Sequence, residues 1–149
     1  VADLGSGTGF YTDEVAPAAG RVLAVDVQPE MHAHYRRKGV PANVALVTAA
    51  VSALPVPAGA LDAAFSTMTF HEFATPDALA EVARALAPGG RLAVADWTAS
   101  GEGTSGPPVS ERFDAAQAVT MLEDAGFEVG HASDRRETFV VSATAPERS

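Results

Sequence analysis

The chain has 149 residues, a length that suits a single domain able to bury one hydrophobic core. Its 19 acidic residues outnumber its 10 basic ones, and the resulting formal net charge of −9 disfavours tight binding to nucleic acid. It contains no cysteine and no run of 18 apolar residues, so disulfides, thiolate metal sites and a membrane-spanning helix are excluded and we expect a cytoplasmic protein.

The acidic composition has two explanations that the sequence leaves open. Lys38 is the only lysine, whereas arginine occurs nine times. Scarce lysine with abundant acid, alanine and valine suggests a halophilic origin, because salt screens the self-repulsion of an acidic surface. An ordinary acidic cytosolic enzyme from a GC-rich genome would show the same composition.

Strand and helix patterns alternate along most of the chain, as a parallel sheet requires. Pro29 stands at the first position of one predicted helix, and Thr75 is predicted to cap another. Asp114 caps a further helix, with Gln117 in the capping-box position. The predicted strands are 1–4, 21–26, 44–48, 61–67, 91–97, 127–133 and 138–143; the predicted helices are 10–19, 29–38, one from 76 that residues 88–90 end, and one from 115 that residue 126 ends.

The end of the chain differs from a plain parallel sheet. Residues 99–108 are rich in Gly, Ser, Thr and Pro and are predicted to form a loop. The last two strands, joined by residues 134–137, are predicted to form a hairpin. We therefore expect an α/β fold in one domain over residues 1–149: a Rossmann-like doubly wound sheet of seven strands, mostly parallel, with an antiparallel C-terminal hairpin.

A glycine-rich turn directly follows the first predicted strand. Residues 3–9 read Asp-Leu-Gly-Ser-Gly-Thr-Gly, and Asp26 ends the second predicted strand. Glycine permits positive φ and lets a ligand lie against backbone N–H groups, while an acid at the tip of the second strand can accept both hydroxyls of a ribose. The pattern indicates a nucleotide-type ligand; a tight strand-to-helix turn without a ligand is the alternative, which Asp26 disfavours.

The spacing of Gly5, Gly7 and Gly9 is G-x-G-x-G, whereas dinucleotide-binding domains usually show G-x-G-x-x-G. It resembles motif I of the class I S-adenosylmethionine-dependent methyltransferases. Other segments resemble the type 11, or ubiquinone-biosynthesis-like, methyltransferase domain in the same order, namely 26, 53–55, 61–62, 71–72, 86–92 and 122–127. The resemblance implies S-adenosylmethionine as cofactor and a fold whose seventh strand is inserted antiparallel beside the fifth.

The resemblance also implies which residues hold the cofactor. The backbone of Gly5, Ser6 and Gly7 would follow its methionine part. Asp3 would brace the loop and reach the amino group, directly or through water. Asp26 would accept two charge-assisted hydrogen bonds from the ribose hydroxyls.

The adenine end departs from the family pattern at one position. Val27 would pack on one face of the adenine and Val51 would cover it, with nearby backbone N–H groups in contact with the ring. The family usually has an aspartate where this chain has Ala50, and that aspartate accepts a bond from the adenine amino group. We expect the loss to weaken binding by about 1 kcal/mol, the value of one hydrogen bond between neutral groups.

Two residues concern the chemical step, one at the end of the fourth predicted strand and one just after it. Thr67 ends that strand where the substrate would meet the methyl group. His71 follows, and an imidazole titrates near neutral pH, which suits a general base that takes a proton from the substrate. The alternative is that His71 and Glu72 only pack the start of the next helix.

Three further side chains have open interpretations. Arg112 either ties down the loop before it, holds a substrate anion, or pairs with a nearby acid. Phe10 and Tyr11 open the first predicted helix, where one of them edges the cofactor pocket or both pack in the core.

The resemblance implies methyl transfer to a small-molecule acceptor by direct displacement, with no metal. Two alternatives remain: a non-catalytic S-adenosylmethionine-binding or regulatory module, and an NAD(P)-dependent oxidoreductase, for which the glycine spacing is unsuitable. Because the chain begins inside the first predicted strand, we expect that the helix that normally covers the cofactor is missing.

Overall fold

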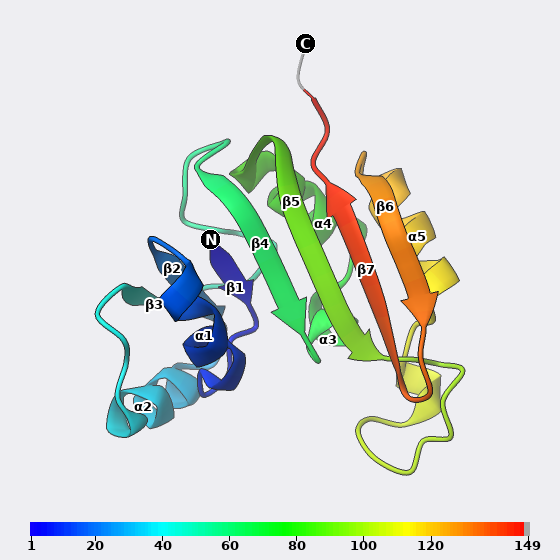
Figure 1. The fold of residues 1–149 in the computed structure, drawn as a ribbon, viewed down its shortest axis with the longest axis horizontal. Helices are drawn as coiled ribbons and strands as arrows, with labels where there is room; N and C mark the ends of the chain where they lie inside the picture. The colour runs from blue at the N-terminus through cyan, green and yellow to red at the C-terminus, as the bar shows by residue number, and fades with distance from the viewer. Residues whose placement is uncertain (148–149) are drawn as a thin grey trace.

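The computed structural model describes residues 1–147 and contains a seven-stranded sheet (Figure 1). The strand order is β3-β2-β1-β4-β5-β7-β6, and all neighbours are parallel except β7, which is antiparallel to both β5 and β6. The order reverses between β1 and β4, so the predicted doubly wound α/β fold with an antiparallel C-terminal hairpin is confirmed. The strands are β1 (Ala2–Leu4), β2 (Val22–Asp26), β3 (Val44–Thr48), β4 (Leu61–Thr67), β5 (Leu86–Trp97), β6 (Glu128–Asp134) and β7 (Thr138–Thr144).

Helices connect the strands and cover the sheet. α2 contacts β2 and β3, while α4 and α5 contact each other and lie behind β5, β7 and β6 in Figure 1. Within residues 1–147, no helix is both long and apolar enough to cross a membrane. The helices are α1 (Phe10–Val15), η1 (Ala16–Ala18), α2 (Pro29–Lys38), α3 (Phe70–Phe73), α4 (Pro76–Ala85), η2 (Val109–Glu111) and α5 (Ala115–Asp124).

The helix starts predicted from local sequence are confirmed. The Thr75 side chain accepts a hydrogen bond from the backbone N–H of Ala78, as an N-cap does. Asp114 and Gln117 form both bonds of the capping box at the start of α5. These caps fix where α4 and α5 leave the loops that precede them.

The predicted boundaries are wrong at the end of α1 and around Leu86. The predicted helix 10–19 ends as an α-helix at Val15 and continues as the 3-10 turn η1, because Pro17 lacks the N–H that an α-helical turn needs. α4 ends at Ala85 rather than at residues 88–90, and β5 begins at Leu86 rather than residue 91, since Leu86 already pairs with Leu61 of β4. Residues 87–90 then bulge out of the strand, and the regular ladder resumes at Arg91.

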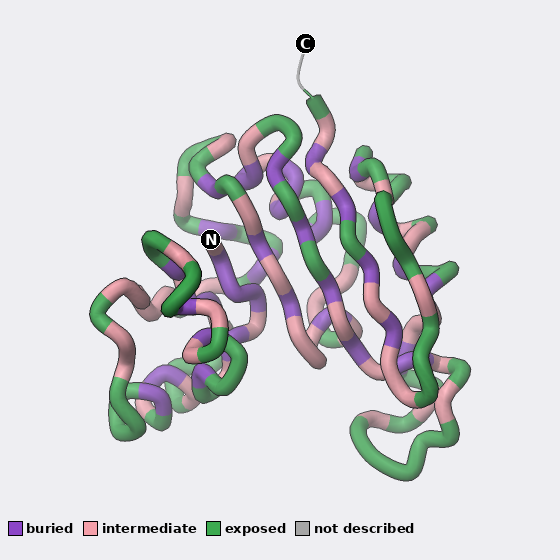
Figure 2. Tube along the Cα trace, in the orientation of Figure 1, coloured by how far each residue is buried: buried purple, intermediate pink, exposed green. Residues whose placement is uncertain are grey.

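The core lies between the sheet and the helices that cover it, and buried residues alternate with more exposed ones along β4 and β5 in Figure 2. Phe70 is completely buried at the start of α3 and meets the rings of Phe73, Phe113 and Phe139 edge-on. This aromatic cluster anchors α3, a helix the sequence did not predict, beside the ends of β4 and β5. The core therefore fixes the short helix that borders the cleft described next.

Candidate functional site

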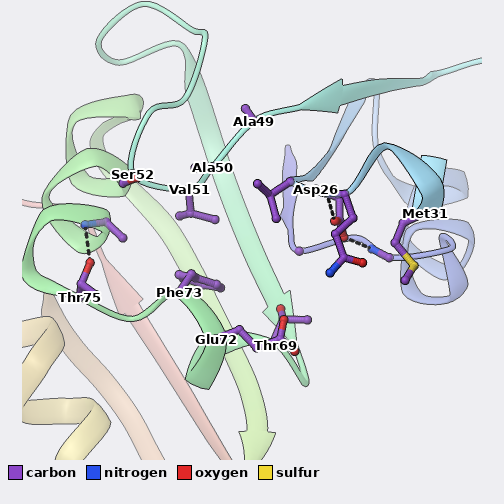
Figure 3. A pocket seen from close by; sticks show the side chains of 15 residues that line it. Asp26, Met31, Ala49, Ala50, Val51, Ser52, Thr69, Glu72, Phe73 and Thr75 are labelled. Carbon is purple, nitrogen blue, oxygen red and sulfur yellow. Dashed lines mark hydrogen bonds between the residues drawn. The ribbon is translucent and has the colours of Figure 1, made fainter.

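A cleft of about 540 Å³ opens at the carboxyl ends of β1 and β2, beside the point where the strand order reverses. Ligands of doubly wound sheets bind at this position. Figure 3 shows the segment from Ala49 to Ser52 on one side, α3 on another and Asp26 facing the space between them. The lining residues are Gly5, Gly7, Asp26, Val27, Gln28, Met31, Ala49, Ala50, Val51, Ser52, Thr69, Glu72, Phe73, Thr75 and Ala78.

The glycine turn at residues 5–9 forms the floor of the cleft. Gly9 has φ of +87°, and a β-carbon there would lie 2.3 Å from the ring of Tyr35, so only glycine fits. Gly7 has φ of +57° but a β-carbon there would meet no atom within 4 Å. Gly7 therefore presents bare backbone to the cleft, as close approach of a ligand requires.

Two backbone N–H groups hold the carboxylate of Asp26 in place (Figure 3). Its Oδ2 accepts the N–H of Gly7 at 2.8 Å, and its Oδ1 accepts the N–H of Gln28 at 2.8 Å. Each carboxylate oxygen has a second lone pair, so the oriented group can accept two more hydrogen bonds from a ligand. This is the geometry that a ribose diol requires.

Asp3 lies buried beneath the turn and is only partly satisfied. Its Oδ2 accepts a 2.6 Å hydrogen bond from Thr12 Oγ1, but its Oδ1 is buried without a partner among residues 1–147. Burial raises the pKa of Asp3 to about 6, against the lowering effect of the Thr12 bond, and the charge of Asp26 raises it further. The Ser6 hydroxyl is also buried without a partner in this part of the chain.

These two unpartnered atoms fit the amino-acid end of S-adenosylmethionine, which carries a positively charged amino group. Among the described residues that line the cleft, Asp26 and Glu72 are acidic and none is basic. A cleft with carboxylates and no cation favours a positively charged ligand and disfavours a phosphate. The acidic and hydrogen-bonding groups at this end of the sheet therefore fit S-adenosylmethionine, the cofactor that the sequence predicts.

The adenine side of the cleft is the segment 49–52, and its position depends on α4. Glu81 accepts the backbone N–H of Leu54 at 2.7 Å, and Arg84 donates to the carbonyls of Leu54 and Val56. Arg84 also pairs with Glu81 and lowers its pKa. The ion pair thus holds the loop just beyond Ser52, a contact that sequence reasoning missed because 27 residues separate Glu81 from Leu54.

The structure brings most of the predicted cofactor residues together. Those that line the cleft are Gly5, Gly7, Asp26, Val27, Ala50 and Val51. Asp3, Ser6 and Thr67 are not among the lining residues; the first two lie buried under the turn and Thr67 ends β4. Sequence reasoning missed Ser52, whose side chain lies at the cleft beside Ala50, and Thr69, which follows β4 as a site residue of such a sheet would.

His71 does not line the cleft, although its neighbour Glu72 does. Its Nδ1 lies 2.8 Å from Oδ2 of Asp96 at the end of β5, and its Nε2 lies 4.0 Å from Oε1 of Glu72. The side chain is 11% exposed. The imidazole is therefore held at the end of β5 beside a residue that lines the cleft, and its role as a base stays a prediction.

Arg112 ties down the loop that precedes it. Its guanidinium donates to the backbone carbonyls of Thr98, Ser105 and Pro107, pairs with Glu137 at 3.1 Å and lies over the Trp97 ring. With its side chain fully buried in these contacts, it does not face the cleft.

Phe10 and Tyr11 are 66% and 38% exposed, so they do not pack in the core, and neither lines the cleft. Their rings meet each other edge-on at the start of α1. The cleft gives no support to the expectation that one of them edges the cofactor pocket, and this expectation stays a prediction.

Comparison with known proteins adds a family to this geometry. A family described as "Methyltransferase domain" matches residues 2–94. An uncharacterized methyltransferase of Mycobacterium tuberculosis is 33% identical over 135 residues, covering 83% of this chain and 54% of that protein. A demethylmenaquinone methyltransferase of Thermus thermophilus is 39% identical over 112 residues, covering 71% of this chain and 50% of that protein.

Among solved structures, an S-adenosylmethionine-dependent methyltransferase from Aquifex aeolicus superposes with a TM-score of 0.88 and 32% identity. The match covers 97% of this chain and 80% of that one. A putative methyltransferase of Haloferax volcanii, solved in complex with an activator protein, shares the fold with a TM-score of 0.82 at 21% identity. The chain spans about half the length of the curated relatives that it matches.

Proposed function

Because this chain belongs to the class I S-adenosylmethionine-dependent methyltransferases, we propose that it transfers a methyl group from S-adenosylmethionine to a small-molecule acceptor by direct displacement. The observation that carries the proposal is Asp26, whose carboxylate is oriented over the glycine turn by the N–H groups of Gly7 and Gln28. No other described part of the cleft is so specific for a ribose.

The proposal assigns roles to residues of the cleft and to Asp3 beneath the glycine turn. The bare backbone at Gly5 and Gly7 lies along the methionine part, and the unpartnered Oδ1 of Asp3 accepts from its amino group. Asp26 accepts from both ribose hydroxyls. Val27 and Val51 cover the faces of the adenine.

The remaining adenine-site and rim residues complete the proposed site. Ala50 contributes backbone in place of the usual acid, and Ser52, which also lines the cleft, accepts from the adenine amino group. Thr67 marks the end of β4, where the methyl group meets the acceptor. His71 takes the proton of the acceptor.

When bound, S-adenosylmethionine supplies a methyl group on a positively charged sulfur, with a good leaving group. The protein therefore needs to align the acceptor with that methyl and to exclude water, and no covalent intermediate with the chain is required. Asp26 and Glu72 stabilise the bound cation, but the positive charge is lost as the methyl leaves, so these acids contribute to affinity more than to rate.

Two observations support a small-molecule acceptor. The net charge of −9 repels the phosphate backbone of nucleic acids. The relative from Thermus thermophilus is named for demethylmenaquinone, which is a small molecule.

Calorimetric titration with S-adenosylhomocysteine, with NADH as the control ligand, tests the cofactor at low and at molar KCl. We expect saturable binding of S-adenosylhomocysteine alone, and its loss in Asp26→Ala but not in Asp124→Ala, an exposed acid on α5. Retained affinity in Asp26→Ala would overturn the proposal.

Methyl transfer itself is tested with isotopically labelled S-adenosylmethionine and a small-molecule cell extract. We expect label in low-molecular-mass products that depends on the protein. Cofactor binding without any labelled product would instead assign the chain as a binding or regulatory module.

A further inference from the structure

Asp96 and His71 form a buried pair at the end of β5 that the sequence did not predict. Asp96 is 0% exposed, and its carboxylate accepts three N–H groups: the backbone N–H and the Nδ1 of His71 at Oδ2, and the backbone N–H of Trp97 at Oδ1. The distances are 2.7, 2.8 and 2.8 Å. An ionised carboxylate only accepts, so Nδ1 of His71 carries the proton that it donates to Asp96.

This tautomer leaves the lone pair of the neutral ring on Nε2. Nε2 faces Glu72, whose Oε1 lies 4.0 Å away and whose side chain lines the cleft. The ring is thus fixed at one nitrogen by the end of β5, and its other nitrogen lies next to Glu72, a residue that lines the cleft. An aspartate that orients a histidine in this way is the arrangement that prepares a histidine to accept a proton.

A purely structural role would explain only part of these contacts. Asp96 also accepts the backbone N–H of His71 in the first turn of α3, which lacks a side-chain cap from Thr69. That cap needs the carboxylate but not the imidazole, since any residue at position 71 offers the same N–H. The additional bond to Nδ1, made by a histidine that is nearly buried, is what points to chemistry.

We propose that Asp96 is a positioning residue that holds His71 with Nε2 free, and that the pair accepts the proton of an acceptor hydroxyl of alcohol, phenol or enol type. This inference rests on the proposed methyl transfer. The acceptor oxygen gives an electron pair to the methyl carbon, the pair of the broken carbon–sulfur bond stays on sulfur, and the hydroxyl proton goes to Nε2. The imidazolium formed is stabilised by the carboxylate of Asp96. A neutral amine acceptor already has a free lone pair and would need no such base.

Long-range ¹H–¹⁵N NMR of the labelled chain reads the tautomer without any acceptor. The His71 signals are assigned by their absence in His71→Gln, and His131, exposed on β6, is the internal control. We expect a protonated Nδ1 and an unprotonated Nε2 on His71 near pH 8. S-adenosylhomocysteine should shift Nε2 of His71 and leave His131 unchanged.

Two variants separate positioning from structure. Asp96→Asn should keep Nδ1 protonated, because its single oxygen takes the place of Oδ2, which accepts both N–H groups of His71. It removes the charge that stabilises the imidazolium, so methyl transfer should fall while the affinity for S-adenosylhomocysteine is kept. His71→Gln should keep the fold and the affinity for S-adenosylhomocysteine but lower methyl transfer by about 10²–10⁴-fold. If Asp96→Asn does not fold, the wild-type tautomer and ligand shift decide alone.

The outcomes distinguish this inference from the function on which it rests. An Nε2-protonated His71 in the wild type, or a ring that does not respond to S-adenosylhomocysteine that calorimetry shows to bind, would overturn the role of the pair and leave methyl transfer standing. Methylation at nitrogen in the isolated product would overturn the hydroxyl class. Absence of S-adenosylhomocysteine binding would instead refute the proposed function itself.

Discussion

Replacing Asp3 by asparagine tests whether a buried charge is maintained for the cofactor at the expense of stability. Asp3 is 1% exposed, and burial raises its pKa from 3.8 to about 6. Because the folded-state pKa lies above the unfolded one, the folded state binds more protons between these values and the protein loses stability as pH rises from about 4 to 6. The shift of roughly 2 pKa units corresponds to about 3 kcal/mol at neutral pH.

Asparagine keeps the acceptor for Thr12 Oγ1 but carries no charge. Its amide N–H₂ takes the place of Oδ1, which has no partner, so the N–H₂ is buried without an acceptor. This cost offsets part of the stability gained by removing the buried charge. We therefore expect Asp3→Asn to be more stable than the wild type at pH 7 by about 1–3 kcal/mol, or roughly 3–10 °C in Tm. Affinity for S-adenosylhomocysteine should fall about 10–100-fold, since a charge-assisted bond to its amino group is lost.

Thermal denaturation of both proteins from pH 3.5 to 8, followed by calorimetry at pH 7, measures these effects. Below pH 4 the variant should be equally stable or slightly less stable than the wild type, because the uncompensated amide remains and the charge is absent. The difference should rise in its favour up to pH 6 and stay constant above it. Asp124→Asn, at an exposed position of α5, should show a flat difference throughout. A difference that does not change with pH would refute the buried charge, and a stabilised variant with wild-type affinity would refute the contact with the amino group.

Gly9→Ala is expected to prevent stable folding, because its β-carbon would lie 2.3 Å from the Tyr35 ring, whereas Gly7→Ala should fold and lose affinity for S-adenosylhomocysteine. Thermal denaturation and calorimetry distinguish the two variants. Normal binding by Gly7→Ala would contradict the assignment of Gly7 to the floor of the cleft. Glu81→Gln should weaken the binding of S-adenosylhomocysteine and lower the stability of the protein at neutral pH. The loss of stability should vanish as pH falls from 4.5 through the lowered pKa of Glu81, because the wild-type carboxylate is then protonated. A loss of stability that does not change with pH would contradict the ion pair with Arg84. Arg112→Lys should lower Tm without changing affinity, and an altered affinity would connect its loop to the cofactor site.

Local rules predicted the fold and the cofactor turn well. The glycine turn, the acid at the end of β2 and the caps at Thr75 and Asp114 each depend on residues close together in the sequence, so their chemistry is visible there. The seven strands and the hairpin followed from hydrophobic runs and turn residues. The errors lie where tertiary pairing overrides local signals, as at Leu86, which joins β5 because Leu61 lies opposite it.

The pairing of His71 with Asp96 could not be predicted from the sequence. Twenty-five residues separate them, and their contact depends on the register in which Thr67 of β4 lies opposite Ala95 of β5. It also depends on Met68, a non-glycine residue with φ of +61°, which turns the chain from β4 into α3. Neither the register nor the left-handed residue has a sequence signal of its own.

The unfavourable features of this molecule concentrate at the cofactor end of the sheet. Within residues 1–147, two of the three buried side-chain polar atoms without a partner are Asp3 Oδ1 in β1 and Ser6 Oγ in the glycine turn, and the non-glycine residue with positive φ is Met68 beside α3. Such features cost free energy and persist only where the surrounding structure holds them. In the proposed function the amino group of the cofactor would satisfy Asp3, directly or through water, and cofactor binding and stability would then be linked at this end of the sheet. The antiparallel hairpin, in contrast, has β7 paired with a strand on each side and needs no ligand.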